Sequence, residues 1–188
     1  GLRTTIIKRP TLTTVEVLLA PVKGAKKTHF ITGYVHKPYP RVYALLARHA
    51  GFDDTLVIRG TEGGVIPSLR QDSRMFVVHD KGAEQAVEIR PQDIGIEQEV
   101  RAPLIPGMDD AGELESHVGS FDAAKVSAQA AEAGLAALNG QKGATYDSLV
   151  LGAAIMLHGL KKADSIAAGA DMARKALDSG AAKARFVA

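Results

Sequence analysis

The segment spanning residues 28–59 constrains the fold most, because it combines two strand patterns with a helix between them. Residues 28–35 alternate in polarity and are rich in β-forming side chains, and residues 55–59 are a short apolar run. Residues 41–49 have helical character and are followed by Gly51 at the position of a C-terminal cap. Strand, helix and strand joined by short connections predict a parallel βαβ unit.

The remaining chain extends this α/β pattern. Two further strands are predicted at residues 74–79 and 86–89, with a turn at 80–82 between them. Three helices are predicted after residue 120, at residues 122–138, 146–158 and 163–178. We therefore expect an α/β fold with a mostly parallel sheet, helices on both faces and a helical C-terminal layer, forming one domain over residues 1–188.

Composition narrows the class of protein. Hydrophobic residues make up 46% and charged residues 23% of the 188, which is typical of a globular chain and argues against disorder. There is no run of eighteen apolar residues, so no membrane span is predicted. The absence of cysteine removes thiolate metal sites and thiol nucleophiles, and it is compatible with the cytoplasmic location that we expect.

Charge is divided unevenly along the chain. Residues 1–50 hold nine Lys or Arg residues against one acid, Glu16, which gives a net charge of +8. The other 138 residues hold fourteen basic and twenty acidic residues, which gives −6. Such a division suggests that a basic region faces a polyanion, although the same side chains could be solvated and scattered over several faces.

Seven basic side chains and two glycines are candidates for binding phosphate. The basic candidates lie in a glycine-containing loop, along the helix of the βαβ unit and at the end of its second strand, where α/β sheets place ligands. The glycines could offer backbone N–H groups to an anion. The candidates are Lys23, Lys26, Lys27, Lys37, Arg41, Arg48, Arg59, Gly60 and Gly63.

Each candidate also has a purely structural reading. The lysine loop could simply be solvated, and Arg48 could pair with Asp53 or Asp54. Arg59 could be the partner in a structural ion pair. Glycines in such a loop often serve only to permit a turn.

Several motifs resemble anthranilate phosphoribosyltransferases of glycosyltransferase family 3. The similar segments occur in the family's order, and together they cover nearly the whole chain while corresponding to the second half of a family member. They are the strand and loop at residues 55–68, Pro91-Gln92-Asp93-Ile94-Gly95, Asn139-Gly140, Gly143-Ala144, Asp147 and residues 178–182. The resemblance implies the C-terminal domain of a phosphoribosyltransferase or nucleoside phosphorylase-like fold, taken from a longer two-domain protein, with residues 1–25 crossing to a helical domain.

One departure from that family bears directly on chemistry. The family's loop carries Asp-Gly-x-Asp-Glu, and its final acid pair holds Mg²⁺ on the substrate pyrophosphate. Here Val65 and Ile66 stand in place of that pair. Aliphatic side chains offer no oxygen to a hard cation, which requires several oxygen ligands. We therefore predict no metal site, no cofactor and no catalytic residue for the chain.

The segments Thr61-Glu62-Gly63-Gly64 and His36-Lys37-Pro38-Tyr39 resemble a divergent branch of this family. That branch forms homodimers and binds DNA or RNA with little sequence preference, which implies a nucleic-acid-binding protein that contacts phosphates through lysine and arginine. The alternative is a working, Mg²⁺-dependent anthranilate phosphoribosyltransferase or related pentosyltransferase of tryptophan biosynthesis. It would use phosphoribosyl pyrophosphate and anthranilate, with carboxylates recruited from elsewhere such as Glu62.

Overall fold

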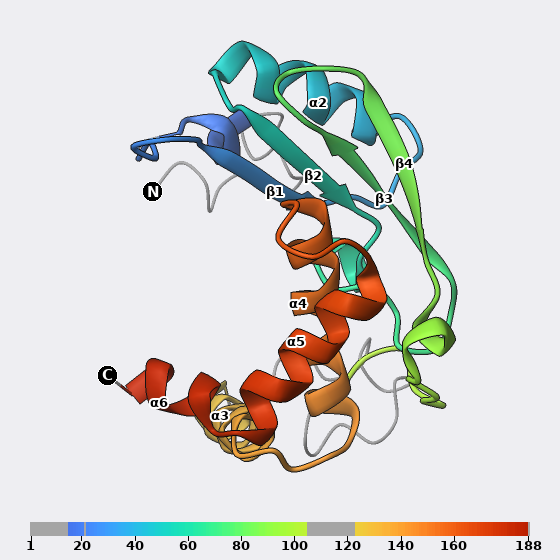
Figure 1. Ribbon diagram of the computed structural model, residues 1–188, viewed down its shortest axis with the longest axis vertical. Helices are drawn as coiled ribbons and strands as arrows, with labels where there is room; N and C mark the ends of the chain where they lie inside the picture. The colour runs from blue at the N-terminus through green and yellow to red at the C-terminus, as the bar shows by residue number, and fades with distance from the viewer. Residues whose placement is uncertain (1–14, 21, 105–122, 188) are drawn as a thin grey trace. The chain divides into compact units, whose positions relative to one another are not determined.

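The computed structural model describes residues 15–20, 22–104 and 123–187, and it has the expected α/β class (Figure 1). The residues form two compact units. The first comprises Gly1–Val65 and Arg74–Val87, and the second comprises Ile66–Ser73 and Glu88–Ala188. Most of residues 1–25, which we predicted to cross to a helical domain, lie outside the described residues, as does the start of the helix predicted from residue 122. The division into one domain or two therefore stays a prediction.

The sheet has four strands in the order β1-β2-β3-β4. They are β1 (His29–Gly33), β2 (Asp54–Ile58), β3 (Ser73–Val78) and β4 (Glu84–Ile89). β1 pairs in parallel with β2, from His29 opposite Asp54 to Gly33 opposite Ile58, which confirms the βαβ unit. β2 pairs antiparallel with β3, so the sheet is mixed rather than mostly parallel. The expectation failed because no crossover helix separates β2 from β3.

The helix of the βαβ unit, α2 (Tyr39–Ala50), begins after Pro38 and ends at Gly51. Gly51 has a φ of 91° and donates its N–H to the carbonyls of Ala47 and Arg48, as predicted for a left-handed cap. Between α2 and the short 3-10 helix η2 (Glu16–Leu18) lies a small apolar cluster. Its buried members are Leu18, Phe30, Ala47 and Phe52.

The second unit is helical, as the predicted C-terminal layer requires. It contains the 3-10 helix η4 (Pro91–Ile94), α3 (Ala123–Leu138), α4 (Ala144–Gly159), α5 (Ile166–Asp178) and α6 (Ala181–Val187). Among the described α-helices only α2 shares a compact unit with the sheet, so the placement of helices on both faces stays a prediction. The sequence reading missed α6, because Gly180, with a φ of 74°, breaks α5 only one residue before a new helix starts.

α4 and α5 pack closely on each other. Val150, Leu151 and Ile155 of α4 have no exposed surface. Ser165 caps α5 by accepting the N–H of Ala168 at 3.1 Å. A Cβ added to Gly169 of α5 would lie 2.7 Å from the carbonyl oxygen of Ala154, so the two backbones touch at this point.

Candidate functional site

The glycine-rich loop that follows β2 packs tightly on the end of β1. The short 3-10 helix η3 (Thr61–Gly63) forms its centre. A Cβ on Gly33 would lie 2.1 Å from the carbonyl oxygen of Gly63 and 2.2 Å from that of Gly64. Only glycine fits at Gly33, because the loop turns its carbonyl groups toward β1 at this contact.

The same loop uses its backbone donors internally. The N–H of Gly60 donates to the carbonyl of Ile58 at 3.0 Å, that of Gly63 donates to Gly60 at 3.3 Å, and that of Gly64 donates to Thr61 at 2.9 Å. A phosphate would have to displace these hydrogen bonds to bind at Gly60 or Gly63. The glycine contribution to the predicted site is therefore not preformed, and the turn-forming reading of these glycines describes the structure better.

Val65 and Ile66, which the resemblance places at the family's acid pair, are half-buried. The side chain of Ile66 lies 3.5 Å from the point where a Cβ on Gly152 of α4 would be, so it packs as an apolar residue. Ser68 is buried and its hydroxyl accepts the N–H groups of Arg70 at 3.2 Å and Gln71 at 3.1 Å. The segment is structural, and it places no carboxylate oxygen where a hard cation would need one.

No three His, Cys, Asp or Glu side chains gather into a metal-binding group within residues 15–20, 22–104 and 123–187. The acid of the loop itself, Glu62, is exposed and has a left-handed φ of 52°.

Arg59, at the end of β2, lies beside an arginine that the sequence reading missed. The N–H of Arg59 donates to the carbonyl of Arg74 at 2.9 Å, which places the two residues side by side on neighbouring strands. Both guanidinium groups act on buried Tyr34: burial raises the pKa of the phenol, while the charges of Arg59 and Arg74 lower it. Only the antiparallel register of β2 and β3 brings Arg74 to this place.

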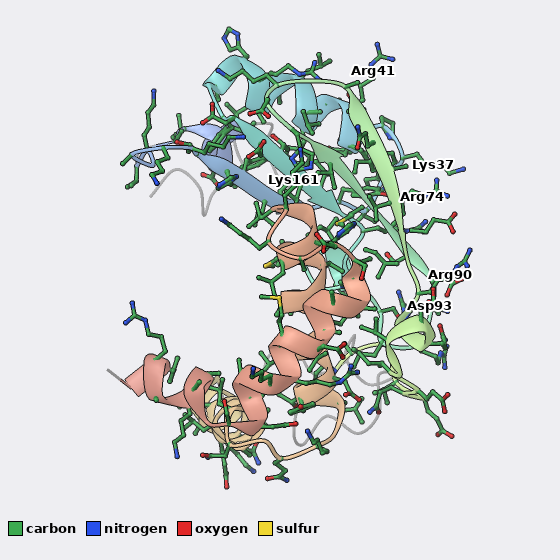
Figure 2. All side chains as sticks on the ribbon, in the orientation of Figure 1. Lys37, Arg41, Arg74, Arg90, Asp93 and Lys161 are labelled. Atoms are coloured by element: carbon green, nitrogen blue, oxygen red, sulfur yellow. The ribbon has the colours of Figure 1, made fainter. Side chains whose placement is uncertain are left out.

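Lys37 and Arg41 belong to the same end of the sheet, because they lie where the chain leaves β1 and enters α2. Both are exposed, and the first turn of α2 contains no acid. Figure 2 shows Lys37, Arg41 and Arg74 extending from the same side of the ribbon. We call Lys37, Arg41, Arg59 and Arg74 the carboxyl-end cluster.

Lys23, Lys26, Lys27 and Arg48 lie at the opposite end of the sheet, where β1 and β2 begin. Lys23 and Lys26 are exposed, but the ammonium group of Lys27 lies 2.5 Å from Asp80 and 3.5 Å from Asp54. The hydrogen bond with Asp80 is the main reason why the pKa of Lys27 is raised. Lys27 therefore acts first as a structural ion-pair partner.

Arg48 is half-buried and donates to the carbonyl of Gly82 at 2.8 Å, rather than pairing with Asp53 or Asp54. It ties α2 to the turn between β3 and β4. With Lys23, Lys26, Lys27 and the exposed Lys81 of that turn it forms the amino-end cluster. A five-residue strand spans roughly 15 Å, so the described candidate side chains fall into two groups, one at each end of the sheet.

Comparison with known proteins gives a consistent result. No family model matches the chain. Anthranilate phosphoribosyltransferases from Verminephrobacter eiseniae, Methanobrevibacter smithii and Azospirillum brasilense are 27%, 27% and 30% identical to it over 92%, 94% and 91% of its length. The chain spans about half the length of these relatives, covering 45%, 47% and 43% of them.

A solved structure agrees with these sequence matches. A variant of anthranilate phosphoribosyltransferase from Saccharomyces cerevisiae, solved with Mg bound, superposes with a TM-score of 0.66 at 18% identity. The match covers 97% of this chain and 47% of that one. The chain has the anthranilate phosphoribosyltransferase fold.

The expected resemblance is thus confirmed, including its half-length correspondence to a family member. None of the described helices has both the length and the apolarity to cross a bilayer. The nucleic-acid partner, the homodimer and the cytoplasmic location stay predictions.

Proposed function

We propose that the chain binds the phosphate backbone of nucleic acids, with little sequence preference, on a phosphoribosyltransferase scaffold that does not use magnesium. The observation that carries this proposal is the cationic end of β2, and the aliphatic pair that follows it in the sequence supports the proposal. Where related enzymes carry two acids, Ile66 packs against α4. At the end of the neighbouring strand, Arg59 and Arg74 lie side by side.

The chemistry of the carboxyl-end cluster suits a phosphodiester better than a metal–pyrophosphate complex. Its members are four cations on three adjoining parts of the chain, namely the entry to α2, the end of β2 and the start of β3. Guanidinium groups bind phosphate oxygens through paired N–H donors and need no bridging metal. Contacts of this kind supply affinity without reading base sequence.

Fluorescence anisotropy tests the proposal directly. Labelled oligonucleotides of about 30 nucleotides and unrelated sequence should bind with similar affinity, since aligned cations track a backbone rather than bases. With four phosphates neutralised, the logarithm of the affinity should fall with the logarithm of salt concentration with a slope of about −3 for a single strand. Absence of binding at low salt would refute the proposal, and strong preference for one sequence would refute its non-specific form.

A second candidate is phosphoribosyl transfer to anthranilate, which the matches to three enzymes of that name favour. It would require acids from outside the Val65-Ile66 position to hold Mg²⁺, with Glu62 the acid present in the loop. The test is Mg²⁺-dependent consumption of phosphoribosyl pyrophosphate in the presence of anthranilate. We expect no turnover above the background rate, and turnover that is lost in Glu62→Gln would establish this candidate instead.

A further inference from the structure

A buried carboxylate organises the amino end of the sheet. The side chain of Asp54, the first residue of β2, is only 5% exposed. One of its oxygens lies 3.0 Å from Nδ1 of His29 and 3.5 Å from the ammonium group of Lys27. The other accepts the N–H of Asp80 at 2.9 Å and lies 3.5 Å from Nδ1 of His79. An imidazole at the start of β1 and another just beyond the end of β3 therefore share one acid.

This arrangement fixes the direction of both rings. Because His29 and His79 each turn Nδ1 toward Asp54, the Nε2 atom on the opposite side of each ring points away from the carboxylate. The side chain of His29 is 35% exposed and that of His79 is 19% exposed. On protonation, each Nε2 becomes an N–H donor that carries positive charge.

The turn beside His79 is held in a costly conformation. Asp80 and Lys81 have left-handed φ values of 49° and 60°, which non-glycine residues seldom adopt. The turn closes through a 2.8 Å hydrogen bond from Gly82 N–H to the carbonyl of His79, and Lys81 N–H donates to the carbonyl of Asp53 at 2.9 Å. Strained residues that many contacts hold in place are common at binding sites.

Charge at this end depends strongly on the two histidines. The amino-end cluster supplies five cations, Lys23, Lys26, Lys27, Arg48 and Lys81. The acids of the same segments are Asp53, Asp54 and Asp80, so the net charge is +2 with both imidazoles neutral and +4 with both protonated. Protonation of both imidazoles would therefore double the positive charge counted for these segments.

We propose that His29 and His79, oriented by Asp54, form a second phosphate-binding site that engages a nucleic-acid backbone when their imidazoles are protonated. The ligand is a phosphodiester, whose oxygens accept hydrogen bonds from the outward Nε2–H groups. Lys23 and Lys26 lie in the loop that leads into β1 and add positive charge at this end of the sheet. This inference rests on the proposed nucleic-acid binding and adds a pH-dependent second contact to the carboxyl-end cluster.

The test compares binding of a labelled single strand of about 30 nucleotides near pH 6 and near pH 8. Each additional phosphate neutralised on a single strand changes the salt slope by about 0.7. Two contacts should therefore steepen the slope by up to about 1.4 near pH 6 and raise affinity by up to roughly 20-fold at about 0.1 M salt.

The variant that isolates the site is His29→Asn combined with His79→Asn. An asparagine amide can still donate to Asp54 from the position of Nδ1, but it has no second nitrogen and no titration. The ratio of affinities near pH 6 and near pH 8 should fall at least several-fold in this variant. The matched control, His36→Asn, alters a histidine beside Tyr39 at the other end of the sheet and should keep the ratio.

Nuclear magnetic resonance of the unaltered chain provides a readout that does not depend on the folding of a variant. The imidazole signals of His29 and His79 should shift when the oligonucleotide is added near pH 6. Unmoved signals, or an affinity ratio that the double variant leaves unchanged, would overturn the second site while leaving the proposed function intact. Absence of binding at both pH values would instead refute the proposed function itself.

Discussion

The two ends of the sheet contain similar numbers of cations and use them differently. At the carboxyl end, Arg59 and Arg74 lie side by side near Tyr34, next to a loop fixed by backbone contact with Gly33. At the amino end, Lys27 lies between two acids and Arg48 binds a carbonyl. Lys27 and Arg48 therefore also hold the amino end together, by contacting segments that are distant in the sequence.

The largest expected effect is a loss of stability when the backbone contact at Gly33, at the carboxyl end of the sheet, is broken. Gly33→Ala would place a methyl group about 2 Å from two carbonyl oxygens, so the loop must move. We expect a loss of about 3 kcal/mol in the free energy of unfolding, measured by urea denaturation. The control is Gly134→Ala in α3, where a Cβ meets nothing within 4 Å and helix propensity should add up to about 1 kcal/mol. Equal effects of the two changes would contradict the close packing.

The amino end should instead depend on its buried acid. Asp54→Asn keeps the shape of the side chain but removes the charge that faces Lys27 and His29. We expect a loss of about 2 kcal/mol in the free energy of unfolding near neutral pH. Asp72→Asn, which alters an exposed acid 3.8 Å from Arg90, should change stability by less than about 0.5 kcal/mol.

That loss should depend on pH in a defined direction. Burial works to raise the pKa of Asp54, but the Asp80 N–H and the charges of Lys27 and His29 hold it below its ordinary value. A carboxyl whose pKa is lowered by folding contributes stability above its unfolded pKa, and this contribution is lost as pH falls through the folded value. The difference between the unfolding free energies of the unaltered chain and Asp54→Asn should therefore be largest near neutrality. It should shrink below about pH 4, and a difference that grew in acid would contradict the assignment.

The next prediction concerns the contribution of the carboxyl-end cluster to oligonucleotide binding. Arg59→Gln combined with Arg74→Gln removes two cations of the carboxyl-end cluster and should weaken oligonucleotide binding by roughly 20-fold at about 0.1 M salt, or about 1.8 kcal/mol. Arg90→Gln is the control, because it removes a guanidinium that lies outside the carboxyl-end cluster, 2.8 Å from Glu88. A comparable loss in both proteins would mean that general charge, rather than this cluster, governs affinity.

The smallest expected effect is a difference in oligonucleotide affinity between variants of two neighbouring lysines. Lys26 is exposed, whereas Lys27 is held by Asp80 and Asp54. Lys26→Gln should weaken binding by up to about fivefold and reduce the salt slope by about 0.7. Lys27→Gln should alter affinity less than Lys26→Gln, as measured in the same titrations. The reverse order would show that the ion pairs of Lys27 open when nucleic acid binds.

Local signals were sufficient to predict the βαβ unit and its cap. Alternation in the sequence of β1, the prolines before α2 and Gly51 after it act over a few residues, and the structure confirms the strand, the helix and its cap. The antiparallel pairing of β2 with β3 carried no comparable local signal, because it depends on how the chain turns between residues 59 and 73.

The candidate site was harder to predict, because its contacts join residues far apart in the chain. Arg74 is paired with Arg59 through strand register, and Lys27 meets Asp80 across 53 positions. Charge counts cannot show which lysine a distant acid will neutralise. The occupied N–H groups of Gly60 and Gly63 were equally hidden, since glycine content predicts a turn but not the direction of its amides.

The backbone contact between Gly169 and Ala154 has a mechanical consequence. Helices separated by side chains can slide as those side chains change rotamer, but here no side chain lies between the two backbones at the contact. A displacement of either helix would therefore move the other helix by nearly the same amount. We therefore expect α4 and α5 to move together as one rigid body.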